Sequence, residues 1–239
     1  MNDIVIPPDP RLAFMGTALQ TRQSAHFVPN SLHGITLLTK TQGGVGADTF
    51  ASLLAYVLEE QGAPSPPIFQ AGGTKGLLCD VCQSTQFQRV PLSGQIGPQL
   101  DHQLAQFLAE NAVGPAIVII SPEANELALG ILRTISKRGL PIPLYNIHLA
   151  RPPFANLAMA EKLRSLCKSS AVAMVKPLIQ QESYDQVLLI PRLPEVLIQS
   201  MEGNRWSFRT AWEHADFGLK LAEDERIERF MAQLAQFYG

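Results

Sequence analysis

Short apolar runs alternate along this chain with longer amphipathic stretches. Runs bounded by glycine or proline are typical of buried strands, and strands that alternate with helices predict a parallel sheet joined by right-handed crossovers. Helices then cover both faces of the sheet. We therefore predict an α/β fold, a three-layer sandwich with a mostly parallel sheet. The predicted strands are residues 35–40, 66–70, 115–120, 141–148 and 171–175.

The longer stretches carry apolar residues at helical spacing. We predict helices over 47–62, 100–110, 121–138 and 153–168. The third of these begins Ser121-Pro122-Glu123, which combines an N-cap serine, a first-turn proline and an acidic residue near the positive end of the helix dipole.

The alternation weakens past Pro177. Residues 187–190 are interpreted either as a further strand or as a helix start, and Pro191 and Pro194 interrupt the run. Residues 201–212 are predicted to be a polar connection that carries two tryptophans.

The last element, residues 221–238, is predicted to be an amphipathic helix. Its apolar face would hold Ile227, Phe230, Met231, Leu234, Phe237 and Tyr238, opposite Glu223, Asp224, Glu225, Glu228 and Arg229. Because membrane-surface helices are typically rich in lysine and arginine, this acidic helix indicates packing on the protein's own sheet or on a partner.

Domain organisation follows from these patterns. Residues 1–34 contain four prolines without sustained periodicity, and we expect an extended N-terminal arm. This arm is either loosely attached, which the sequence favours, or covers a sheet edge or binds a partner. Residues 35–239 form one α/β domain of ordinary size.

A glycine-rich turn at residues 42–46 joins the first strand to the first helix. Such a turn directs backbone N–H groups and the helix dipole at one point, which is a site for anions such as phosphate. A standard phosphate loop ends in Gly-Lys-Ser/Thr, whereas this chain has Gly46-Ala47-Asp48. Hydrolytic chemistry is therefore expected to be impaired or lost.

The octapeptide at 42–49, QGGVGADT, and the helix that follows resemble the deviant phosphate loop of the ParA/MinD family, Lys-Gly-Gly-Val-Gly-Lys-Thr/Ser-Thr. The resemblance covers residue 35 to the C-terminus. It implies a P-loop NTPase fold of the SIMIBI class with a phosphate cradle. The cradle residues that match are Gly43, Gly44, Val45, Gly46 and Thr49.

The charged groups of that family are substituted in this chain. Gln42 stands where the resemblance places the signature lysine, Ala47 at the phosphate lysine, and Asp48 at the hydroxyl that holds Mg²⁺. The acidic Asp-x-Asp motif falls on residues 70–72, Gln-Ala-Gly, and the metal-side aspartate falls near Ser121. The Asp48 carboxylate would in addition repel a polyphosphate at close range.

The loop at 71–76 follows the second strand and is predicted to face the same crevice, because ligands of open α/β sheets bind at the carboxyl ends of the strands. Lys75 is then a candidate for anion contact, or an ordinary solvated lysine. The expected phosphate-contact residues are Gly43, Gly44, Val45, Gly46, Ala47, Asp48, Thr49 and Lys75.

These features favour a degenerate ParA/MinD-like pseudo-ATPase that acts as a binding or assembly component, in plasmid or chromosome partition, conjugation, or positioning of a cellular machine. We assign no catalytic residue and no metal ligand, and expect ATP or ADP to bind with weakened affinity. The alternative is an active ATPase with relocated groups: Lys40 or Lys75 for phosphate, Thr49 for Mg²⁺ and Glu123 for water.

Charge modifies this interpretation only locally. The net charge of -2 provides no overall attraction to nucleic acid, but residues 121–176 carry eight basic and three acidic side chains. These are either scattered solvated residues or a surface that binds DNA nonspecifically, as the resemblance implies. The candidate contacts are Arg133, Lys137, Arg138, Lys162, Arg164 and Lys168.

Three cysteines are too few for a disulfide framework, and the pair Cys79 and Cys82 lacks the second half of a zinc site. No signal peptide or membrane-spanning apolar run is found. We expect a cytoplasmic protein with a protein partner or a homodimeric state.

Overall fold

The computed structural model describes residues 34–40, 46–71, 87–89, 115–122, 129–130, 133, 143–150, 158–175 and 186–239, with only the backbone described for 87–89. The predicted arm, the helix at 100–110 and most of the helix at 121–138 lie outside these residues.

The core is a seven-stranded sheet in the order β3-β2-β4-β1-β5-β6-β7, in which every pair of neighbours is parallel. The strands predicted near residues 35, 66, 115, 141 and 171 are confirmed, and the ambiguous run at 187 is a strand. Bounds are Ile35–Lys40 (β1), Ile68–Ala71 (β2), Phe87–Arg89 (β3), Ala116–Ile120 (β4), Leu144–Leu149 (β5), Ser169–Met174 (β6) and Val187–Leu189 (β7).

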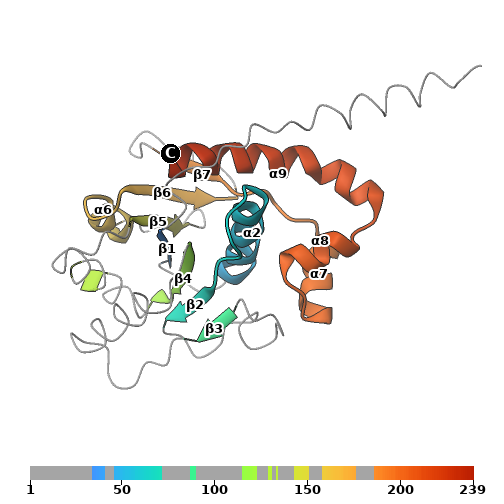
Figure 1. Cartoon of the computed structure of the whole chain (residues 1–239), viewed down its shortest axis with the longest axis horizontal. Helices are drawn as coiled ribbons and strands as arrows, with labels where there is room; N and C mark the ends of the chain where they lie inside the picture. Colours follow the sequence, from blue (N-terminus) through green and yellow to red (C-terminus); the bar gives the residue numbers. More distant parts are fainter. Residues whose placement is uncertain are drawn as a thin grey trace, which may run out of the picture.

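Helices lie on both faces of this sheet, so the predicted three-layer arrangement is confirmed (Figure 1). On one face, Leu38 and its neighbours pack against α2 (Ala47–Glu60), α8 (Phe208–His214) and α9 (Phe217–Tyr238). On the other, α6 (Ala158–Arg164) places Ala160 against Val172 and Met174 of β6. Alternation of side chains along each strand produces the two faces.

Helix α2 is central because most of its side chains are buried, Phe50, Leu54 and Leu58 among them. It ends as the sequence predicts. Gly62 adopts a left-handed φ of 88°, and the N–H of Ala63 donates to the Leu58 carbonyl over 3.0 Å, which closes the last turn.

The expected polar connection at 201–212 is wrong. This region lies within two helices, α7 (Glu195–Asn204) and α8. Ser207 caps α8 by accepting a hydrogen bond from the Thr210 N–H, and Phe208 stacks on Trp212 at 5.9 Å. Each of these short helices buries only two or three residues, so their many exposed polar residues made the segment look like a polar connection.

Helix α9 is confirmed as amphipathic, but it begins at Phe217, one turn earlier than predicted, because Asp216 caps it through the Leu219 N–H. Glu223, which the pattern places on the polar face, is buried at 8% exposure. Its carboxylate accepts two hydrogen bonds of 3.1 Å from Arg226, so the charge is paired.

The last residue of α9 anchors the helix beneath the sheet. The Tyr238 hydroxyl lies 2.8 Å from Thr36 Oγ1 of β1, and its ring packs edge-on against Tyr145 at 4.8 Å. Burial raises the pKa of Tyr238 well above its ordinary value. The ring contact with Tyr145 and the buried hydrogen bond to Thr36 thus hold the last turn of α9 against the sheet.

Candidate functional site

The candidate site lies at the carboxyl edge of the sheet, where β1 leads into α2 and where β6 and β7 also end, since parallel strands place their carboxyl ends at one edge. Helix α2 begins at this edge with Gly46, which has φ 73° and ψ 31° and offers no side-chain cap to the first turn. Its carbonyl accepts the first helical hydrogen bond, from the Phe50 N–H at 2.9 Å. The remaining N–H groups of the first turn give this edge the positive end of the helix dipole.

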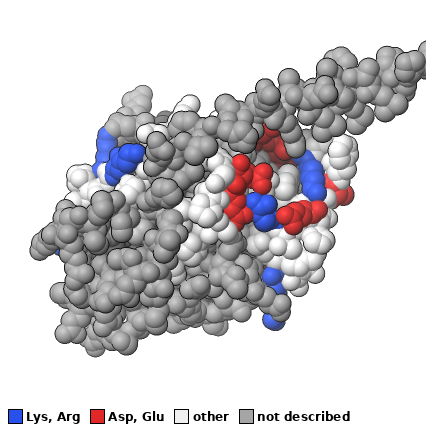
Figure 2. Space-filling model, in the orientation of Figure 1, with Lys and Arg blue, Asp and Glu red and all other residues white. Residues whose placement is uncertain are grey.

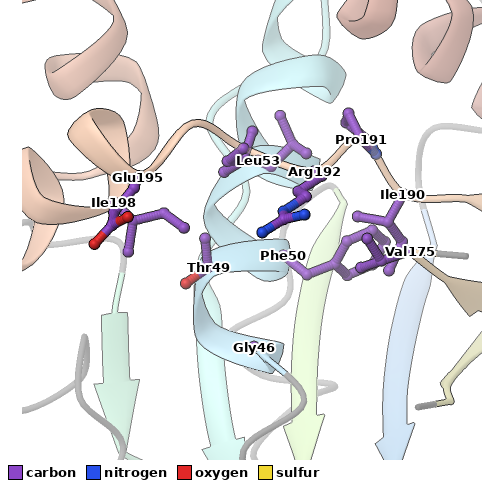
Figure 3. A pocket seen from close by; sticks show the side chains of 11 residues that line it. Gly46, Thr49, Phe50, Leu53, Val175, Ile190, Pro191, Arg192, Glu195 and Ile198 are labelled. Atoms are coloured by element: carbon purple, nitrogen blue, oxygen red, sulfur yellow. The ribbon is translucent and has the colours of Figure 1, made fainter. Parts of the chain in front are cut away.

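A cavity of about 380 Å³ opens beside this first turn. It lies between α2 and the connection from β7 to α7, and Figure 3 shows the side chains that surround it. The volume falls in the range of small-ligand sites. The lining residues are Gly46, Thr49, Phe50, Leu53, Val175, Ile190, Pro191, Arg192, Leu193, Glu195 and Ile198.

Most of the cavity wall is apolar, and its polar groups are few. Thr49 contributes a hydroxyl from α2, while Arg192 and Glu195 contribute opposite charges from the β7–α7 connection and the start of α7. In Figure 3 the Arg192 guanidinium extends toward α2 beside Phe50, and Glu195 lies on the far side of Thr49. The cavity therefore has a positive side and a negative side.

The β7–α7 connection is held at both ends. The Ile190 N–H donates to the Met174 carbonyl of β6 at 2.9 Å, and Leu197 donates to the Pro194 carbonyl at 3.0 Å. Pro191 and Pro194 restrict φ between these points. The connection is thus bonded to the sheet at Ile190 and continues into the first turn of α7 at Pro194, while the exposed Arg192 side chain lines the cavity between these points.

The positions that the sequence assigns to lost acidic motifs lie at this same edge. Gln70 is buried in β2, and within the described part of the chain its Oε1 has no hydrogen-bond partner. Ser121 follows β4 and donates its hydroxyl to the Ala71 carbonyl at 3.2 Å. Among the described residues, none of the seven strands ends in a carboxylate.

The structure brings together part of the predicted phosphate site. Gly46 and Thr49 line the cavity, whereas Ala47, which is buried, and Asp48 lie in the same first turn without lining it. Gly43, Gly44, Val45 and Lys75 lie outside the described residues. Lys40, named for the active alternative, ends β1 at the same edge; Glu123 is not described.

Sequence reasoning missed Arg192 and Glu195. The available signal was the Pro191-Arg192 pair directly after a strand, because the end of a parallel strand lies at the ligand edge. The sequence alone does not decide whether residues 187–190 form a strand or the start of a helix, so it could not place Arg192 at the end of a strand.

Some of the basic residues proposed for DNA contact are described by the structure, and the others lie outside the described residues. Lys162, Arg164 and Lys168 are exposed on α6 and the turn that follows it, and Arg133 is exposed in a short described stretch. Lys137 and Arg138 lie outside the described residues. Lys168 also donates to the Tyr145 hydroxyl at 3.4 Å.

Within the described ranges, no group of three or more His, Cys, Asp or Glu side chains is arranged to hold a metal. Cys79 and Cys82 lie outside these ranges. Cys167 is a free, partly buried thiol, and desolvation raises its pKa to about 12. No helix among the described residues is long and apolar enough to cross a membrane.

Comparison with protein-family models and with curated proteins finds no match. Among solved structures, the chain is similar to the signal recognition particle receptor FtsY from Elizabethkingia anophelis in complex with GDP. That match has a TM-score of 0.35 and 11% identity, over 59% of this chain and 48% of that one. It is also similar to chloroplast FtsY from Physcomitrella patens, with a TM-score of 0.39 and 16% identity over 59% of this chain and 49% of that one. The chain spans about half the length of each, and at this identity neither assigns it a function.

Proposed function

We propose that this protein is a ParA/MinD-like pseudo-ATPase, a binding or assembly component that binds ATP or ADP weakly in the cavity beside α2 and does not turn it over. The observation that carries the proposal is the position of Gly46 and Thr49. Both belong to the sequence that resembles the family's phosphate loop, and both line a cavity of ligand size at the carboxyl edge of a parallel sheet.

The lack of turnover rests on chemistry. Phosphoryl transfer depends almost entirely on positioned positive charge, a metal ion and an oriented nucleophile. At the first turn of α2, Ala47 is apolar and Asp48 is negative, so neither can act as the phosphate lysine. Gln70 and Ser121 occupy the edge positions where metal-side carboxylates are expected.

Isothermal titration with ATP, with and without Mg²⁺, combined with a phosphate-release assay tests this function. We expect saturable binding and phosphate release at the protein-free rate. Robust turnover would overturn the pseudo-ATPase assignment and favour the active alternative, with Lys40 or Lys75 on phosphate. In that case Lys75→Ala would abolish release while Lys220→Ala, on α9, would leave it unchanged.

A second candidate function, nonspecific DNA binding, is favoured by the exposure of Lys162, Arg164 and Lys168. Figure 2 shows basic side chains at the end of the molecule that carries α6. The surface over α2 and α8 instead mixes both signs, because Arg209 lies among Glu59, Glu60 and Glu213. Of these two described surfaces, the α6 surface is therefore the better candidate for contact with DNA phosphates.

The DNA proposal is tested by titrating random duplex DNA at several salt concentrations. The double change Lys162→Ala and Arg164→Ala should weaken binding. It should also reduce the slope of log K against log salt concentration by about 2, one for each lost phosphate contact. The matched control is Lys220→Ala with Arg229→Ala on α9, which removes the same charge elsewhere. Equal effects of the two pairs, or binding that salt leaves unchanged, would exclude this surface.

A further inference from the structure

The cavity contains one cationic side chain, Arg192, among its described lining residues. We propose that Arg192 is the anion-binding residue of this site. In this assignment its guanidinium and the first turn of α2 bind the phosphate of a phosphate-bearing ligand between them. This inference rests on the proposed function and deepens it, because it identifies the source of positive charge that the glycine turn lacks.

The charge balance at the first turn of α2 requires such a group. Gly46, Ala47 and Thr49 carry no charge, and Asp48 adds a negative one. The helix dipole supplies only about half an elementary charge, which the Asp48 carboxylate offsets. A phosphate bound here without a further cation would therefore be held weakly.

The geometry makes Arg192 available for this role. Its guanidinium extends toward α2 beside Phe50 in Figure 3, on the cavity side of the β7–α7 connection. Among the described residues it forms no hydrogen bond or ion pair, whereas Arg209, Arg226 and Arg229 are each paired with glutamates. An arginine that keeps its donors available beside a helix N-terminus is suited to bidentate phosphate binding.

The second charge of the cavity sets the orientation of the ligand. Glu195 lies on the other side of Thr49, and its carboxylate accepts a hydrogen bond of 3.1 Å from Gln199. An anion is repelled on that side and attracted on the Arg192 side. Between them, Phe50, Leu53 and Ile190 form an apolar wall for an uncharged part of the ligand. The site thus fits a ligand with a phosphate at one end and an apolar or flat body.

Calorimetric titration of the full chain with ADP, adenosine and inorganic pyrophosphate tests the assignment. Arg192→Ala should weaken ADP and pyrophosphate binding about 10- to 100-fold, the loss expected for a charge-assisted hydrogen-bond pair, and leave adenosine binding unchanged. Arg192→Lys should recover part of the affinity. The control is Arg229→Ala, an exposed arginine on α9, with circular dichroism used to confirm that each variant is folded.

The outcomes separate this inference from the proposed function. Pyrophosphate binding that depends on Arg192, without any nucleotide binding, would support the anion site and overturn the nucleotide-binding function. ADP binding of equal strength in wild type and Arg192→Ala would overturn the role of Arg192 and leave the function standing. Failure of all three ligands to bind the wild-type protein would overturn both.

Discussion

Ser52 of α2 accepts a hydrogen bond of 2.7 Å from the backbone N–H of Phe208, the first residue of α8, in a fully buried contact. One side-chain oxygen thus satisfies the N-terminal end of one helix from the middle of another. Ser52 lies one turn beyond Thr49 and beside Leu53, so this contact also fixes the helix that forms one wall of the cavity.

Ser52→Ala should lower the free energy of unfolding by about 1–3 kcal/mol, because it leaves the Phe208 N–H buried without its acceptor. Ser200→Ala is the matched control, since the Ser200 hydroxyl donates only to the Val196 carbonyl of its own exposed turn. Urea denaturation measures both variants. Equal losses would show that the α2–α8 contact adds no stability.

Gly46→Ala should destabilise the protein by about 1–2 kcal/mol, the cost of a left-handed φ in a residue with a Cβ. Apart from its chain neighbours, no atom of the described residues lies within 4 Å of that Cβ, so the expected effect is conformational rather than steric. Gly203→Ala, in the open helical face of α7, should instead stabilise by about 0.5–1 kcal/mol. Thermal unfolding compares the two; a stabilised Gly46→Ala would refute the assigned backbone geometry.

Tyr238→Phe should cost about 1–3 kcal/mol at pH 7, because Thr36 loses its buried partner. Burial raises the pKa of Tyr238, so the folded protein keeps this proton while the unfolded chain loses it above pH 10.0. The stability from this residue is therefore complete below that pH and is lost above it. At pH 11 the difference between wild type and Tyr238→Phe should shrink by about 1.4 kcal/mol. If the difference in unfolding free energy between wild type and Tyr238→Phe stayed constant from pH 7 to 11, this would contradict burial of the Tyr238 hydroxyl.

Cys167 should react slowly with iodoacetamide, because the thiolate is the nucleophile and burial raises the pKa of this thiol to about 12. At pH 8, alkylation of the native protein should be at least about tenfold slower than alkylation of the guanidinium-unfolded chain. Peptide mass spectrometry resolves Cys167 from the other two cysteines. Equal rates would indicate a solvent-accessible thiol with an ordinary pKa.

The sequence predicts the central strands well because β4 is a continuous apolar run and β1 interrupts its apolar residues only with two threonines before Lys40. β1 and β4 are buried on both faces, so their residues, such as Leu37 and Val118, show no polar alternation that invites another interpretation. Helix α2 is equally clear, since a glycine turn begins it and Gly62 ends it.

The helices α7 and α8 could not be recognised in the same way. They are short, two prolines precede them, and only a few of their positions are buried, Leu197 and Met201 in α7. The place of α8 against α2 comes from long-range contacts such as Ser52 with Phe208 and Arg209 with Glu59 at 2.5 Å, and α7 packs in turn on α8. No local pattern encodes these contacts.

The sequence predicts only some of the residues that line the candidate site. A local motif identified Gly46 and Thr49, because the glycine turn and the helix it begins are consecutive in sequence. Arg192 and Glu195 reach the same cavity only through the tertiary structure, because β7 runs parallel to β1 and its carboxyl end lies at the edge where α2 begins. Tertiary topology, and not sequence spacing, completes the site.

Backbone amide chemical shifts of ¹⁵N-labelled protein during titration with MgADP test most directly whether this cavity is the nucleotide site. We expect the largest shifts at Gly46, Ala47 and Thr49 on α2 and at Arg192 across the cavity, and little change in α6 and at the end of α9. Saturable binding with its largest shifts elsewhere, or no shifts at millimolar MgADP, would contradict this expectation.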